Sequence, residues 1–295
     1  MISVSSFASS SDEEFIIQDE MRPLQEDLIL HSIEFEVEEF LGHGFFGAVW
    51  KVRPKNPGMM AKIPGFEGFS ELIIKVPISP IYREKLDDDQ KYLEVLHSKG
   101  LQKDYKSQYS DNKRALFKTY IQGLTFKNWV TYLKENKRKQ ELLTQLEIYR
   151  NRAWILESVF FSFMQNRIKR DAIEVELKEI GERHADIGVL ENEEIYNALT
   201  ALQKKLTEAC IAIYDLTDEN LMYSNNKWYV VDGNSIKESD HLGKNFILHG
   251  IKKIRGQFSS LGDIHLVEIS RHDAEQWYQD EFDSLYRKLE HLNFE

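Results

Sequence analysis

The sequence predicts an α+β protein, and three observations support this prediction. A glycine-rich turn joins two strand-like segments within residues 34–53. Several later stretches carry apolar residues at spacings of three and four, which is the pattern of amphipathic helices. Short apolar runs that end in aspartate lie near residues 211–232. The 295 residues can bury a large core, either as one two-lobed domain or as two small ones.

Composition narrows the class of protein. Apolar residues make up 42% of the chain and charged residues 29%, which is typical of a globular protein. No apolar run reaches the roughly 18 residues that a membrane-spanning helix needs. The net charge of −11 argues against a nucleic-acid partner and is compatible with a basic protein partner. Cys210 is the only cysteine, which excludes an internal disulfide, and its apolar neighbours are more typical of a core residue than of a catalytic thiol.

The N-terminal segment, residues 1–30, is predicted to be a flexible acidic tail. It is rich in serine, aspartate and glutamate and poor in periodic apolar residues. It has neither the basic region nor the apolar region of a Sec signal peptide. We therefore expect a cytoplasmic protein, or one that leaves the cell by a specialised system.

Four amphipathic helical segments are predicted from the apolar spacing. The segment 139–182 is long enough for one or two helices. We expect one of its faces to pack on the second half of the chain and the other to bind a partner. Its aromatic residues could equally all be core residues. The predicted helices are residues 81–96, 139–182, 193–209 and 270–292. The aromatic residues of the second segment include Trp154, Phe160, Phe161 and Phe163.

The glycine-rich turn is the first candidate functional motif. Residues 42–49 read G-x-G-x-x-G-x-V, with strand-like segments on both sides. A dinucleotide fingerprint requires a helix after the glycines, so this motif is instead the turn of a hairpin. Because glycine has no Cβ, the backbone N–H groups of Gly42, Gly44 and Gly47 can approach the phosphates of a nucleotide. Taken alone, the motif is as typical of an ordinary hairpin turn as of a nucleotide-binding loop.

Three further motifs follow in the order that a phosphotransferase needs. Lys75 lies within the apolar strand-like run 71–76. Asp215 is followed five positions later by Asn220, and apolar residues lie on both sides of this pair. Asp232 ends the strand-like run 228–231. A surface turn rich in Asp and Asn is the alternative interpretation of the middle motif.

With these motifs the chain resembles the protein-kinase superfamily over roughly residues 31–236. The family's glycine loop, strand lysine, D-x-x-x-x-N motif and later aspartate occur here in the same order. Residues 115–123 are similar to the strand that leads into the family's inter-lobe linker. The resemblance implies a two-lobed protein-kinase-like fold with a reduced C-lobe. Its parts would be an N-lobe and hinge at 31–123 and a C-lobe at 124–295, with the helical insertion at about 139–182.

The resemblance also implies roles for individual residues. Lys75 would hold the phosphates of ATP, and Asp215 would accept the proton of the attacking hydroxyl. Asn220 and Asp232 would bind Mg²⁺ through oxygen atoms. An acid on the helix after Lys75 would align it; Glu84 and Asp89 are the candidates. The expected nucleotide-binding residues are Gly42, Gly44, Gly47, Val49, Lys75, Thr119 and Ile121.

Some family positions differ in this chain. Residues 213–215 read Ile-Tyr-Asp where the family has His-Arg-Asp, so control by a phosphorylated activation loop is not expected. Thr217 replaces a lysine of Ser/Thr kinases, and residues 232–234 read Asp-Gly-Asn where the family has Asp-Phe-Gly. No Ala-Pro-Glu motif follows. These differences also fit a pseudokinase that acts as a binding scaffold.

The expected function is that of an ATP- and Mg²⁺-dependent Ser/Thr protein kinase, similar to the compact kinases that bacterial pathogens inject into host cells. Its substrate would be a protein, with a host protein as one candidate, and an activating protein partner is a further expectation. A lipid or small-molecule kinase, an enzyme that transfers AMP, a scaffold and a chance match in an unrelated interaction protein are the alternatives. The Glu-rich run 273–295 is similar to some type IV secretion signals but is more typical of a solvated terminal helix.

Overall fold

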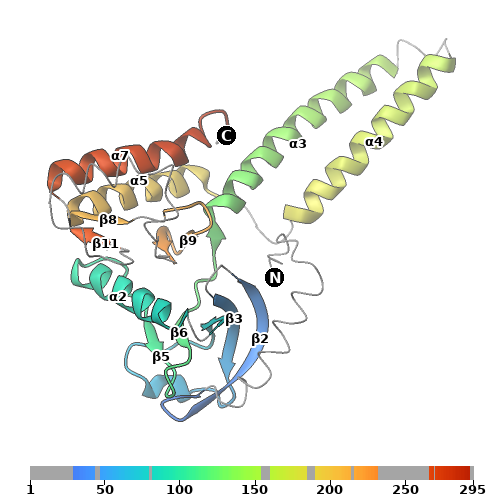
Figure 1. Cartoon of the computed structure of the whole chain (residues 1–295). Helices are drawn as coiled ribbons and strands as arrows, with labels where there is room; N and C mark the ends of the chain where they lie inside the picture. The colour runs from blue at the N-terminus through green and yellow to red at the C-terminus, as the bar shows by residue number, and fades with distance from the viewer. Residues whose placement is uncertain are drawn as a thin grey trace.

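The protein has a mixed α+β fold, seen in a computed structural model (Figure 1). A curved sheet lies at one end, helices α5 and α7 lie at the other, and the long helices α3 and α4 project away from both. The structure describes residues 29–43, 47–79, 82–153, 160–184, 190–213, 216–231, 266–268 and 270–292.

A six-stranded antiparallel sheet contains the predicted glycine hairpin. The strand order is β1-β2-β3-β4-β6-β5, and β2 and β3 are the two arms of the hairpin. The turn residues 44–46 lie outside the described residues. The strands are β1 (Ile29–Leu30), β2 (Ile33–His43), β3 (Gly47–Pro54), β4 (Leu72–Pro77), β5 (Ser107–Tyr109) and β6 (Leu116–Thr119).

One face of this sheet packs on its own apolar core. Alternate residues of β3 and β4, such as Trp50 and Ile74, point into it and are buried. The segment 54–70 contains the 3₁₀ helix η1 (Met59–Lys62) and covers the same face with Met60 and Phe66. Because side chains alternate along a strand, Lys75 of β4 lies on the opposite face.

Helix α2 (Glu84–Ser98) lies between the sheet and the rest of the molecule (Figure 1). It agrees with the helix predicted at 81–96. Leu93 and Leu96 pack into a second core that is distinct from the core of the sheet. Residues 99–112 contain the short strand β5, which pairs with β6. This strand was not among the predicted elements.

The second core is formed by helices and two small sheets. The tilted rings of Phe126, Trp129 and Trp228 lie at its centre, with centroids 5.8–6.0 Å apart. Both indole N–H groups have partners, Asn192 Oδ1 at 3.0 Å and the Ile195 carbonyl at 2.9 Å. The other elements are α5 (Asn192–Ala209), α7 (Arg271–Arg287), β7 (Leu124–Thr125), β8 (Ile211–Ile213), β9 (Leu221–Ser224), β10 (Lys227–Val230) and β11 (Leu266–Glu268).

Helices α3 (Phe126–Ala153) and α4 (Phe160–His184) form an antiparallel hairpin (Figure 1). It begins thirteen residues before the insertion predicted at 139–182. The two helices pack on each other through Leu142, Leu146, Ile173 and Ile180, rather than on the second half of the chain as expected. Trp154 lies outside the described residues, as do the side chains of Phe160, Phe161 and Phe163.

Candidate functional site

Lys75 is a buried cation on the sheet face that lies away from the apolar core. The residue is only 6% exposed. In the register of the sheet, Val49 of β3 and Leu116 of β6 lie beside it, so these residues share its face. A buried ammonium is costly unless it has a partner of opposite charge. The sequence around Lys75 is apolar, and therefore that partner comes from another element.

Asp89 of α2 is the partner of Lys75. Its Oδ2 lies 2.8 Å from Lys75 Nζ, and the residue is 2% exposed. Burial alone would raise the pKa of Asp89, but the ammonium groups of Lys118 and Lys75 hold the pKa below its ordinary value. Of the two acids expected to align Lys75, Asp89 makes the contact. The side chain of Glu84, the first residue of α2, lies outside the described residues.

Lys118 of β6 is a second buried lysine, and the sequence analysis did not select it. Its Nζ lies 3.3 Å from the same oxygen of Asp89. In the sheet Lys118 is opposite Ile73, so it lies on the same face as Lys75. The signal was available, since both lysines interrupt an apolar strand. When all three side chains are ionised, the two lysines and Asp89 together carry one positive charge.

The contacts continue from Lys118 to the second half of the chain. Lys118 Nζ donates a long hydrogen bond of 3.5 Å to the carbonyl of Val231. Tyr105 donates its hydroxyl to the same carbonyl at 3.0 Å, and the N–H of Val231 donates to the carbonyl of Asn220 at 2.9 Å. A continuous series of contacts therefore joins the buried lysines of the sheet to Asn220, a residue predicted to bind a metal.

The two aspartates expected to do the chemistry, Asp215 and Asp232, lie outside the described residues. Their neighbours are described. Val231 immediately precedes Asp232 and is held by the contacts above. Strand β8 ends two residues before Asp215. The hydroxyl of Tyr278 in α7 donates a 2.7 Å hydrogen bond to the carbonyl of Ile211 in this strand.

The glycines of the hairpin have different environments. Gly42 has a φ of 148°, which L side chains rarely adopt, and a Cβ there would meet open space. A Cβ on Gly47 would lie 3.0 Å from the carbonyl oxygen of Val76 and 3.5 Å from the side chain of Lys75. The absence of a side chain at Gly47 thus keeps β3 close to Lys75 and leaves room beside it. Gly44 lies outside the described residues.

The predicted hinge residues follow Lys118 directly. Thr119 is buried, and its N–H and Oγ1 both bond to Lys106, at 2.9 Å each. Thr119 is opposite Leu72 in the sheet, so its side chain lies on the face away from Lys75. Ile121 is half-buried against the second core. The structure places both residues where the chain passes from the sheet to α3.

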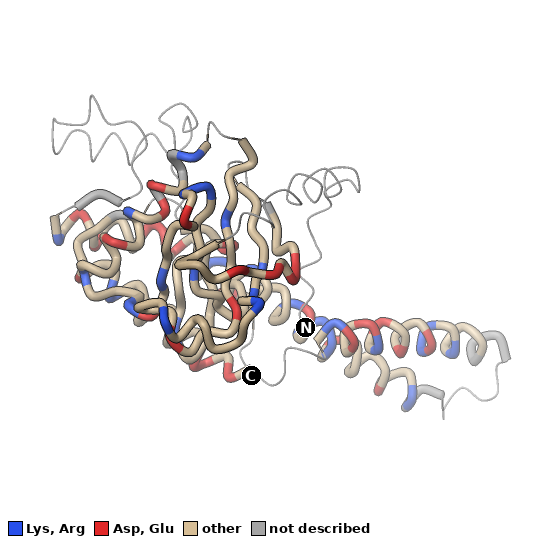
Figure 2. Tube along the Cα trace, turned by 90° about the horizontal axis from the view of Figure 1, so that it is seen from below, with Lys and Arg blue, Asp and Glu red and all other residues tan. Residues whose placement is uncertain are grey.

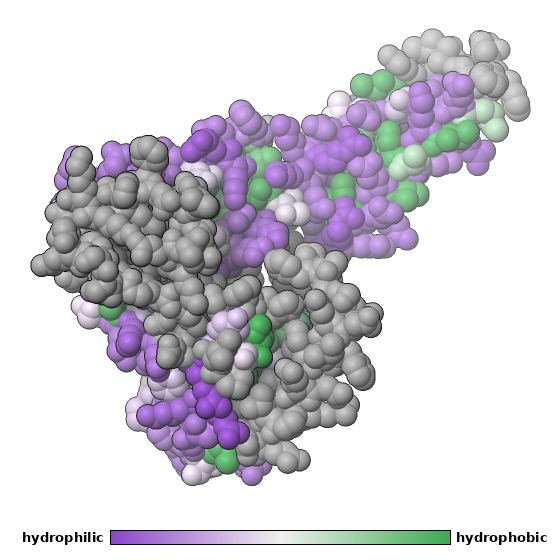
Figure 3. Space-filling model, viewed as in Figure 1, coloured by the Kyte–Doolittle hydropathy of each residue, from purple (hydrophilic) through white to green (hydrophobic). Residues whose placement is uncertain are grey.

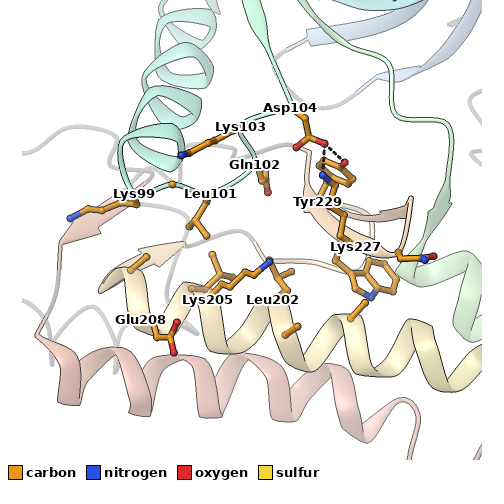
Figure 4. A pocket seen from close by; sticks show the side chains of 17 residues that line it. Lys99, Leu101, Gln102, Lys103, Asp104, Leu202, Lys205, Glu208, Lys227 and Tyr229 are labelled. Carbon is orange, nitrogen blue, oxygen red and sulfur yellow. Dashed lines mark hydrogen bonds and ion pairs between the residues drawn. The ribbon is translucent and has the colours of Figure 1, made fainter. Parts of the chain in front are cut away.

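A separate cleft of about 530 Å³ lies between the loop 99–104 and helix α5 (Figure 4). Neither Lys75 nor Asp89 lines it. At one edge, Asp104 accepts hydrogen bonds from Lys227 and from Tyr229, the latter at 2.6 Å. Burial would raise the pKa of Asp104, but these two hydrogen bonds lower it below its ordinary value. The same loop reaches the candidate site through Gln102, which exchanges two hydrogen bonds with the backbone of Val230.

Further observations bear on cofactors and relatives. Within the described ranges, no three His, Cys, Asp or Glu side chains gather as a metal site would require. No helix among those described is long and apolar enough to cross a membrane. Comparison of the sequence with protein-family models and with curated proteins finds no match.

Proposed function

We propose that this protein is an ATP- and Mg²⁺-dependent phosphotransferase with a two-lobed protein-kinase-like fold, and that its acceptor is a Ser or Thr hydroxyl of a protein. One observation carries the proposal. Lys75 and Asn220 are 145 positions apart in the sequence, yet Asp89, Lys118 and Val231 join them by direct contacts. This series of contacts, which ends on the backbone carbonyl of Asn220, supports the proposal because it connects the lysine expected to bind phosphate with the segment expected to bind the metal.

The residues present fit a nucleoside triphosphate. Two buried ammonium groups, those of Lys75 and Lys118, lie beside Asp89 and would suit an anionic ligand. Gly47 leaves space next to Lys75 that a Cβ would fill. Carboxylate and amide oxygens are suited to Mg²⁺, a hard cation, so Asp232 and Asn220 would hold it.

The mechanism would divide among these side chains. Bound ATP with Mg²⁺ would supply the phosphoryl group and part of the charge neutralisation. Asp89 fixes the position of Lys75, which would orient the phosphates by its charge. Asp215 would orient the acceptor hydroxyl and take its proton. Lys118 is a positioning residue, since it contacts both Asp89 and the backbone that leads to Asp232.

Nucleotide binding is tested first. Mg-ATP at a hundredfold excess over its Kd should stabilise the folded protein by about 2.7 kcal/mol. Lys75→Ala should abolish most of this gain, which a thermal-shift assay measures. If the wild type shows no shift with millimolar Mg-ATP, the proposal is wrong.

Chemistry is tested with labelled nucleotide. In a cell extract, label from γ-labelled ATP should appear on protein, and acid hydrolysis should release phosphoserine or phosphothreonine. Asp215→Asn should still bind Mg-ATP but transfer phosphate about 10²- to 10⁴-fold more slowly. Transfer from α-labelled ATP instead would indicate AMP transfer, and label in lipid or small molecules would indicate a different acceptor.

A scaffold without turnover is the second candidate. It is favoured by the sequence at 213–215 and 232–234, which differs from the kinase motifs. If Mg-ATP stabilises the protein but no acceptor is labelled even in the extract of a host cell, this candidate is correct. The same extract experiment tests whether a host protein is the substrate and whether a partner protein is needed for activity.

A further inference from the structure

The hairpin of α3 and α4 has an interior of its own. Leu142, Leu146, Ile173 and Ile180 are buried between the two helices, and the ion pair of Arg138 with Glu176 at 2.8 Å bridges them. At about 1.5 Å per residue, the 28 residues of α3 span about 42 Å. The inner face of each helix is thus already covered, and the far end of the hairpin is remote from the rest of the molecule (Figure 1).

The outer face of α4 carries three exposed apolar residues, with Asp171 between the second and the third. Met164, Ile168 and Val175 are 43%, 65% and 57% exposed. Their spacings of four and seven place them on one side of the helix, opposite the buried Ile173. Green patches interrupt the hydrophilic surface of the hairpin in Figure 3. Single exposed apolar residues are common, whereas a stripe of them on one helix face marks an interaction surface.

Basic residues accompany this stripe at the far end. We define the distal end as residues 148–153 of α3 and 160–171 of α4. It carries five basic residues and one acid, whereas the whole chain has a net charge of −11 (Figure 2). The basic residues are Arg150, Arg152, Arg167, Lys169 and Arg170. Helix α4 itself begins with Phe160, Phe161 and Phe163.

The basic side chains at the distal end form only weak ion pairs within the hairpin. Arg167 lies 3.9 Å from Asp171, and both side chains are more than half exposed, whereas Arg170, which lies 3.8 Å from Glu174, is partly buried. Such exposed pairs contribute little and exchange readily for other anions.

We propose that the distal end of the hairpin binds the surface of an anionic lipid bilayer. Met164 and Ile168 would enter the interface between headgroups and acyl chains, and Arg167 and Lys169 would contact the lipid phosphates. The length of the hairpin is consistent with this partner. An acidic protein is repelled by an anionic bilayer, but this repulsion is screened beyond a Debye length of about 8 Å. A basic tip held several times farther out can reach the bilayer while the acidic remainder stays in solution.

The test is co-sedimentation of the purified full chain with vesicles. We expect binding to phosphatidylcholine vesicles that contain about 30% phosphatidylserine, weaker binding at high salt, and little binding to phosphatidylcholine alone. Ile168→Asp, and separately Arg167→Glu with Lys169→Glu, should weaken binding at least about tenfold. Val175→Asp is the matched control: it lies on the same face, but about 10 Å farther from the tip than Ile168. It should bind as the wild type does.

Several results would overturn the proposal. These are equal sedimentation with both kinds of vesicle, wild-type binding by Ile168→Asp, or equal loss of binding in Val175→Asp. Light scattering tests a second copy of the chain as the occupant. A wild-type dimer that Ile168→Asp converts to a monomer, without binding to vesicles, would assign the stripe to self-association. Circular dichroism of each variant checks that the helices remain intact.

Discussion

At the scale of single residues, substitution of Asp89 should destabilise the fold most, because its one buried carboxylate contacts two buried lysines. Asp89→Asn should destabilise the fold by about 3–5 kcal/mol, since both ammonium groups lose the buried carboxylate that they contact. Urea denaturation at pH 7 measures this. The triple variant Asp89→Leu, Lys75→Met, Lys118→Met should recover most of the stability but not the shift with Mg-ATP. If the triple variant is as unstable as the single one, packing rather than charge explains the loss.

The pH dependence of this cluster follows from the lowered pKa of Asp89. The unfolded chain has the ordinary pKa of 3.8 and the folded protein a lower one. The carboxylate therefore contributes its full stabilisation above pH 3.8 and loses it as the pH falls through the folded value. The stability difference between wild type and Asp89→Asn should be constant from about pH 5 to pH 8 and should shrink in stronger acid. A difference that changes near neutral pH would contradict this assignment.

The role of Lys118 can be distinguished from that of Lys75 by the effect of its substitution on stability and on Mg-ATP affinity. Lys118→Met leaves the ion pair of Lys75 and Asp89 one-to-one, so the fold should lose much less stability than in Asp89→Asn. The affinity for Mg-ATP should fall by about tenfold, which corresponds to about 1.4 kcal/mol. Titration calorimetry measures the affinity. Lys118→Arg serves as the conservative control and should recover part of the binding if charge at this position is what matters.

At the scale of elements, the loop between α2 and β5 contacts β10, the strand that precedes Asp232. Gln102 satisfies both backbone groups of Val230, with distances of 2.7 and 3.1 Å. Gln102→Leu would leave these buried groups without partners and should cost about 2–4 kcal/mol. Phosphate transfer should fall as well, because Val230 lies two residues before Asp232. Lys103→Gln, an exposed change in the same loop, is the control and should have neither effect.

The sequence predicted most elements because their apolar periodicity is strong. The glycine hairpin and the helix at 193–209 agree with β2, β3 and α5 within a few residues. The short strand β5 has no such periodicity, and only its pairing with β6 defines it. The choice between Glu84 and Asp89 depended on which side of α2 faces the sheet. Lys118 was missed because a lysine in an apolar strand acquires meaning only when its partner on another element is known.

At the scale of the whole molecule, the hairpin should be separable from the rest of the fold. The contribution of α3 to the second core ends at Leu133, and the buried residues between α3 and α4 form a cluster of their own. Near the base, Glu135 pairs with Arg183 at 2.8 Å and with His184. Replacement of residues 141–178 by a short Gly-Ser turn keeps these contacts and removes the distal end.

We expect the shortened protein to keep its shift with Mg-ATP and its phosphate transfer, because neither core loses a residue. It should lose binding to anionic vesicles, because the exposed stripe and the basic residues are gone. Thermal-shift, labelled-ATP and sedimentation assays on one preparation measure all three properties. Retained vesicle binding would exclude the hairpin as the membrane contact. Loss of transfer with intact folding and nucleotide binding would instead show that the hairpin holds the protein substrate, since positioning of the acceptor is the part of phosphoryl transfer that a remote element can supply.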